Sequence, residues 1–125
     1  MVTVLVVDDQ APFRLAARAV VRRADGFDLA GEAASGEEAV DMARELEPEL
    51  VLMDINMPGI NGIEATRQIV AARPGTTVFL CSTYQLSDLP PDAATSGAAA
   101  YVNKEELGAD VLQRLWDTRE DGFSS

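Results

Sequence analysis

Short apolar runs alternate along the chain with stretches in which apolar residues recur at every third or fourth position. Apolar runs bounded by polar, proline or glycine positions indicate strands, and runs rich in valine and leucine are typical of a sheet buried on both faces. Apolar residues at helical spacing indicate helices with one inward face. The pattern predicts strands at 3–7, within 27–34, and at 50–53, 77–81 and 100–102, and helices at 12–24, 36–47, 62–72, 91–97 and 106–119.

The predicted strands and helices alternate throughout the chain. This order calls for a parallel sheet with helices on both faces, joined by right-handed crossovers, which is a doubly wound α/β fold. The fourth helix is short, because Pro90-Pro91 restricts it to about two turns. A chain of 125 residues fits one domain. We place that domain at residues 1–120, with residues 121–125 as a frayed tail or the start of a linker.

Polar residues stand directly after four of the five predicted strands. They are Asp8 and Asp9, Asp54, Ser82 and Thr83, and Lys104. In an open parallel sheet the carboxyl ends of the strands share one edge, where ligands bind. If the four strands are neighbours, three carboxylates, a hydroxyl and an ammonium converge at that edge.

Such a set of side chains suits phosphoryl chemistry. Three neighbouring carboxylates do not all stay ionised unaided, and Mg²⁺ resolves the problem because it prefers oxygen ligands and keeps several waters. With the metal in place, Asp54 would attack a phosphorus centre and form an acyl phosphate. Lys104 and the metal would stabilise the oxygens of the transferred group, and Ser82 would donate a hydrogen bond to one of them.

Composition narrows the function further. The net charge of −11 makes this chain by itself a poor binder of nucleic acid. Histidine is absent, which excludes histidine acid–base chemistry and histidine metal ligands. Cys81 is the only cysteine, so no internal disulfide forms. No apolar run reaches the roughly 20 residues of a membrane span, and we expect a cytoplasmic protein without membrane association.

Taken together, the motifs resemble the receiver domain of bacterial two-component response regulators. They are Asp8-Asp9, Asp54-x-x-Met57-Pro58-Gly59-x-x-Gly62, Ser82 and Lys104. The resemblance covers essentially the whole chain and is strongest to the subfamily with a C-terminal LuxR-type helix-turn-helix domain. It implies a flavodoxin-like, CheY-like fold with strand order 2-1-3-4-5. It also implies a signalling domain rather than an enzyme, in which Asp54 accepts a phosphoryl group from a sensor histidine kinase.

The resemblance also assigns roles to individual residues. Asp9 and Asp54 would bind Mg²⁺ directly, Asp8 would bind it through water, and the backbone carbonyl of Asn56 would complete the protein ligands. Ser82 resembles the hydroxyl switch of the family, and Tyr101 its aromatic switch. Movement of these two residues would alter the face made of the helix at 91–97, the strand at 100–102 and the helix at 106–119. The output would be transcription through a DNA-binding domain absent from this chain, and a homodimer is an open expectation.

Three features depart from the common pattern. Glu105 follows Lys104 where many receivers have proline, and Pro90-Pro91 shortens the predicted fourth helix. Thr83 fills a position often held by alanine or glycine, and its bulk would slow phosphoryl entry and loss. Two other functions stay open, namely a small Mg²⁺-dependent phosphohydrolase with Asp54 as nucleophile and a pseudo-receiver that only binds a protein partner. Asn56 speaks against the hydrolase, because such enzymes need a general acid two residues after the nucleophile. The sequence does not distinguish a stand-alone receiver from an excised one.

Overall fold

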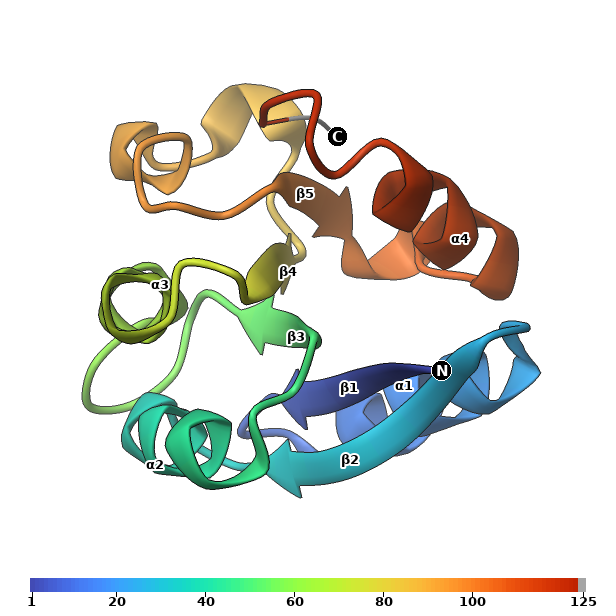
Figure 1. Ribbon diagram of the computed structural model, residues 1–125. Helices are drawn as coiled ribbons and strands as arrows, with labels where there is room; N and C mark the ends of the chain where they lie inside the picture. The colour runs from blue at the N-terminus through green and yellow to red at the C-terminus, as the bar shows by residue number, and fades with distance from the viewer. Residues whose placement is uncertain (124–125) are drawn as a thin grey trace.

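A five-stranded parallel sheet forms the centre of the computed structural model, which describes residues 1–123 (Figure 1). The strands are β1 (Val2–Val7), β2 (Phe27–Ala33), β3 (Leu50–Asp54), β4 (Thr77–Ser82) and β5 (Ala100–Asn103), in the order β2-β1-β3-β4-β5. The α-helices are α1 (Ala11–Arg23), α2 (Gly36–Leu46), α3 (Gly62–Ala72) and α4 (Ala109–Asp117). The predicted doubly wound fold and its strand order are confirmed.

Alternate residues of each strand face opposite layers of helices. Val4, Val6, Leu50 and Leu52 belong to the core cluster that includes residues of α1 and α4, and Leu5, Val7, Val51 and Met53 belong to the cluster that includes residues of α2 and α3. Figure 1 shows these two helix pairs on opposite sides of the sheet. Because side chains alternate across a strand, an uninterrupted apolar run serves both layers.

Polar side chains at the helix starts explain where α2 and α3 begin. The Ser35 hydroxyl accepts a hydrogen bond from the Glu38 backbone N–H at 3.1 Å, and the Glu38 carboxylate accepts one from the Ala34 N–H at 2.7 Å. This reciprocal pair satisfies two N–H groups that have no partner inside the helix. The Asn61 side chain caps α3 in the same way, accepting from the Glu64 N–H at 2.9 Å.

The predicted helix at 91–97 is wrong. The segment between β4 and β5 contains only two 3₁₀ turns, Leu86–Asp88 and Pro91–Ala93. The Ser96 hydroxyl bonds the Ala93 carbonyl at 2.7 Å, and Gly97 has a φ of +99°. A serine that bonds a nearby carbonyl and a left-handed glycine both compete with helical hydrogen bonding, and the stretch is too short to overcome them.

The last helix is shorter than its predicted range of 106–119. The Asn103 side chain accepts a hydrogen bond from the Glu105 N–H at 2.9 Å and starts a 3₁₀ turn over Lys104–Glu106. The backbone is then extended at Gly108, so α4 begins at Ala109. Of the predicted tail at 121–125, Phe123 is partly buried and packs against the core, and residues 124–125 lie outside the described residues. Within 1–123, no helix has the length and apolar character needed to cross a membrane.

Candidate functional site

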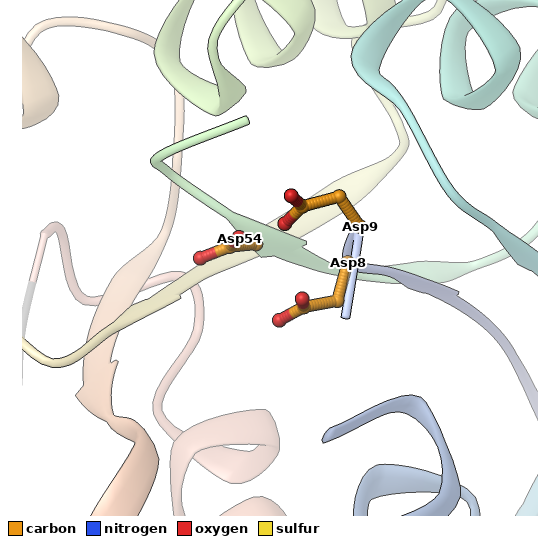
Figure 2. A group of neighbouring side chains, drawn as sticks. All are labelled: Asp8, Asp9 and Asp54. Atoms are coloured by element: carbon orange, nitrogen blue, oxygen red, sulfur yellow. The ribbon is translucent and has the colours of Figure 1, made fainter. Parts of the chain in front are cut away.

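Three carboxylates meet at the carboxyl edge of the sheet. Asp8 and Asp9 follow the end of β1, and Asp54 is the last residue of its neighbour β3. One oxygen from each lies within 4.8 Å of the others, and Figure 2 shows the three side chains pointing to the same side of the strand ends. Asp8 is fully buried and Asp54 is 4% exposed, whereas Asp9 is exposed. The predicted convergence of these strand ends is therefore present in the structure.

Lys104 supplies the positive charge of the site. Its Nζ lies 2.6 Å from Asp8 Oδ2 and 3.2 Å from Asp54 Oδ1, and only 13% of the side chain is exposed. The same ammonium lies 4.5 Å from the centre of the Phe13 ring, close enough for a cation–π contact. Burial lowers the pKa of Lys104, but the bonds to Asp8 and Asp54 outweigh it, and the pKa is raised above its usual value. Lys104 therefore stays charged and bridges two strand ends.

The Asp54 carboxyl has a raised pKa of about 6, against an ordinary value of 3.8. Burial is the main cause and the Asp8 charge adds to it, while Lys104 acts in the opposite direction. One lysine thus does not compensate fully for the buried negative charge. Any further cation that enters the site stabilises the ionised form of such a carboxylate.

The donor set fits Mg²⁺. Asp8 Oδ1 accepts a hydrogen bond from the Gln10 N–H at 2.8 Å. Asp8 Oδ2 pairs with the Lys104 charge but makes no hydrogen bond of good geometry, the one such buried side-chain oxygen among the described residues. Carboxylate oxygens with spare acceptor capacity are the ligands that a hard dication takes. Asn56 is exposed two residues beyond Asp54, and its side-chain oxygen accepts from the Tyr84 hydroxyl at 3.4 Å.

Ser82 ends β4, whose preceding residue Cys81 pairs with Asp54 across the sheet. Its side chain is buried, and its Oγ accepts a hydrogen bond from the Tyr84 N–H at 3.3 Å. An accepting hydroxyl keeps its own proton for another acceptor. Thr83 is exposed at the start of the following loop.

Tyr101 points into the protein in this structure. It is 2% exposed, and its hydroxyl lies 2.6 Å from the Tyr84 carbonyl and 3.0 Å from the Ser82 carbonyl. Burial raises the pKa of the Tyr101 phenol, although the bond to Ser82 lowers it. The side chain of Asn103 donates to the same Tyr84 carbonyl at 3.0 Å. Tyr101 therefore already occupies the inward position that the resemblance assigns to the switched state.

Sequence reasoning missed three residues around this site. Phe13 and Arg14 lie in the predicted helix at 12–24, and both reach the carboxyl edge, Phe13 beside Lys104 and Arg14 at the Asp8 carbonyl. Pro12, two residues before Arg14, predicts that a helix begins next to Asp8-Asp9 and was the available signal. Tyr84 had no signal, because its contacts depend on how the loop after β4 folds.

A doubly wound sheet with two acidic strand ends, a largely buried lysine and a serine at one edge is the arrangement expected of a phosphoryl-accepting signalling domain. Residues 4–115 match the response regulator receiver domain family. The chain belongs to this family, whose members act in two-component phosphorelay signalling and generally bind Mg²⁺.

The chain covers different shares of the proteins it is similar to. The chain is 38% identical over 115 residues to Response regulator GacA of Pseudomonas viridiflava. The aligned region covers 92% of this chain and 54% of that protein. The chain thus spans about half the length of the first curated relatives it matches. The crystal structure of a LuxR-family two-component response regulator from Aurantimonas sp. SI85-9A1 superposes with a TM-score of 0.86 at 30% identity, covering 98% of this chain and 88% of that one. One chain of the CheX–CheY–BeF3–Mg²⁺ complex from Borrelia burgdorferi superposes with a TM-score of 0.79 at 30% identity, covering 93% and 87%.

Proposed function

We propose that Asp54 accepts a phosphoryl group from a phosphohistidine of a sensor kinase in a Mg²⁺-dependent reaction. The observation that carries the proposal is the gathering of Asp8, Asp9, Asp54 and Lys104 at one sheet edge. A carboxylate oxygen of Asp54 forms the new bond to phosphorus, the phosphorus–nitrogen bond of the donor histidine breaks, and the imidazole leaves with the electron pair. The domain acts as acceptor and slowly returns the group to water, so it is a signalling element and not a turnover enzyme.

The neighbouring residues have separate roles in this proposal. Asp9 and Asp54 would hold the Mg²⁺ directly and Asp8 through water, together with the backbone carbonyl of Asn56, and the ion would neutralise charge on the transferring oxygens. Lys104 exchanges part of its pairing with Asp54 for one phosphoryl oxygen. The BeF3 and Mg²⁺ of the Borrelia burgdorferi complex support this proposal, because BeF3 is a chemical analogue of a phosphoryl group.

Ser82, Thr83 and Tyr101 connect the acceptor to the output. Ser82 donates its hydroxyl proton to the new phosphoryl group, and the exposed Thr83 limits access to Asp54 and slows phosphoryl entry and loss. Ser82 and Tyr101 both bond to Tyr84, so a shift of Ser82 changes the support of the segment 84–99. The responding face consists of this segment, β5 and α4, and we name it the output face. It replaces the face expected from the sequence, in which 91–97 was helical.

The wider biology follows from the similar proteins. Residues 1–120 form the receiver domain, and residues 121–125 begin a linker to a DNA-binding domain of the LuxR type, so that the output is transcription. The share of 54% of the GacA length supports this architecture, and the coverage of 87% of a CheY-complex chain supports a stand-alone receiver as the alternative. DNA contact belongs to the additional domain, because this chain carries a net charge of −11. The protein works in the cytoplasm, away from the membrane, and pairing with a second copy stays an expectation.

Covalent labelling tests the proposal directly. The protein is incubated with acetyl phosphate and Mg²⁺, and intact mass spectrometry follows the addition of one phosphoryl group. We expect Mg²⁺-dependent labelling of the wild type, loss of labelling in Asp54→Asn, and unchanged labelling in Asp28→Asn, an exposed carboxylate on β2. Labelling of Asp54→Asn at the wild-type level would refute the assignment. Steady release of phosphate from many small phosphate esters would identify a hydrolase. Absence of any labelling of the wild type would identify a pseudo-receiver.

A further inference from the structure

Arg14 reaches the acidic site from the first turns of α1 without touching a carboxylate there. Its Nη1 donates a hydrogen bond of 2.7 Å to the backbone carbonyl of Asp8. Asp8 is fully buried, and the ladder between β1 and β3 ends one residue earlier, at Val7. A buried carbonyl that has left the ladder needs a donor from elsewhere. Arg14 provides it.

An ion pair with Glu32, which also binds Arg18, holds Arg14 in place. Its Nε lies 3.7 Å from one oxygen of the Glu32 carboxylate, and Arg18 Nε donates to the other oxygen at 2.7 Å. Arg14 and Arg18 are one helical turn apart on α1, and Glu32 lies on β2, so a single carboxylate holds two arginines against the sheet. The three side chains are only 20–34% exposed. This partial burial limits the conformational freedom of the Arg14 guanidinium.

The remaining polar atoms of Asp8 are also fixed. Its N–H donates to the Ala33 carbonyl at 3.1 Å, its Oδ1 accepts from the Gln10 N–H at 2.8 Å, and its Oδ2 pairs with Lys104 at 2.6 Å. Arg14 is the contact that determines the direction of the peptide between Asp8 and Asp9. The direction of that peptide sets where the Asp9 side chain emerges, and Asp9 is the exposed member of the cluster. A metal-ligand site depends on such outer contacts for its geometry.

We infer that Arg14, braced by Glu32, is a positioning residue that orients the Asp8-Asp9 pair for Mg²⁺. The inference rests on the proposed function, because it assumes that these carboxylates bind the ion. The geometric effect of Arg14 on Mg²⁺ binding has the opposite sign to the effect of its charge. A guanidinium repels a dication at long range, so its removal for charge reasons alone would strengthen binding. Loss of the hydrogen bond to Asp8 would weaken it.

Titration calorimetry of Mg²⁺ into the metal-free proteins distinguishes these effects. We expect Arg14→Gln to raise the Mg²⁺ Kd about five- to tenfold, as expected for loss of one hydrogen bond that orients a ligand. Arg14→Lys keeps a donor and should stay within about threefold of wild type. Arg22→Gln is the matched control, because Arg22 is an exposed arginine of the same helix. It removes the same charge without touching Asp8, so its Kd should stay within about twofold of wild type.

The outcomes are separable. Equal effects of Arg14→Gln and Arg22→Gln, or an unchanged or lower Kd for Arg14→Gln, would overturn the role of Arg14. Absence of Mg²⁺ binding in the wild type would instead contradict the proposed function. Glu32→Gln keeps Arg14 but releases its brace, and we expect a smaller increase in Kd, which tests the same role if Arg14→Gln does not fold. No increase in Glu32→Gln would contradict the brace.

Discussion

At the scale of single residues, the site concentrates negative charge where solvent does not reach. Asp8 and Asp54 are buried side by side, and Lys104 is the cation between them. The raised pKa of Asp54 shows that this pairing is incomplete. The folded protein without metal is consequently less stable at neutral pH than it would be with a neutral side chain at this position.

The first residue-scale prediction concerns pH. The folded state holds the Asp54 proton more tightly than the unfolded chain does, with a pKa of about 6 against 3.8. The stabilisation linked to this proton is complete below pH 4 and is lost as the pH rises through 6. Asp54→Asn should therefore gain on the order of 2 kcal/mol over wild type between pH 4 and pH 7.5. Urea unfolding in EDTA measures this gain, and a difference that is independent of pH would contradict it.

The second residue-scale prediction concerns Lys104. Lys104→Ala leaves Asp54 its nucleophilic oxygen but removes the group that would follow a phosphoryl oxygen. We expect acetyl phosphate to label the variant, with hydrogen exchange in the segment 84–99 unaffected by the label. Lys104→Arg retains a cation and serves as the comparison. A label-dependent change in exchange equal to that of wild type would show that Lys104 does not transmit the signal.

Residues at strand ends were predictable from the sequence, and residues that meet them from helices or loops were not. Asp8, Asp54 and Lys104 each follow an apolar run, and parallel topology brings such ends together. The contacts of Arg14 and Tyr84 depend on side-chain direction and loop conformation, for which a single sequence carries no periodic signal. The ligand role of the Asn56 carbonyl stays a prediction.

At the scale of elements, the boundary between β3 and α3 depends on a missing side chain. A Cβ at Gly62 would overlap the Asp54 carbonyl oxygen, and the Gly62 N–H donates to the Ile55 carbonyl at 2.8 Å. The start of α3 therefore lies directly against the end of the strand that carries the acceptor. Gly59 has a φ of +81° and allows a turn between β3 and α3, and a Cβ at this position would meet the Glu37 carboxylate.

Gly62→Ala should consequently destabilise the protein. The methyl group would meet backbone, which does not rotate away, so we expect a loss of about 3 kcal/mol in the free energy of unfolding. Gly75→Ala is the control, since a Cβ there meets nothing within 4 Å. Chemical denaturation of both variants measures the effect. Equal stability of the two variants would mean that the helix tolerates a shift away from β3.

The elements that sequence patterns predicted best were those that pack an apolar face into the core. All five strands and four helices follow apolar periodicity and appear within a few residues of their predicted ranges. The segment 91–97 failed because its alanines resemble a helix in composition, while Ser96 and Gly97 favour other hydrogen bonds. Local competition of this kind is not visible in a pattern of hydrophobic and polar positions.

At the scale of the whole molecule, the net charge of −11 disfavours the compact state through self-repulsion. Among the α-helices of residues 1–123, only α1 has a net positive charge, because it contains four arginines and no acidic residue. Any salt should therefore stabilise the protein to some extent, and a specific effect of Mg²⁺ must exceed that general one.

We predict that Mg²⁺ at tenfold its Kd stabilises the wild type by about 1.4 kcal/mol, which raises the melting temperature by about 5 °C. Sodium chloride of the same ionic strength should give a smaller rise. Asp54→Asn should lose most of the difference between the two salts. Calorimetric melting in each salt makes the comparison, and identical rises in the wild type would show that the ion only screens charge.

The Tyr84 carbonyl has a mechanical consequence. Two donors from neighbouring positions of β5, the Tyr101 hydroxyl and the Asn103 amide, converge on this one oxygen. A displacement of the loop that carries Tyr84 would lengthen both bonds at once. The attachment of the segment after β4 to β5 at this point thus depends on a single acceptor oxygen, and its loss would free both donors together.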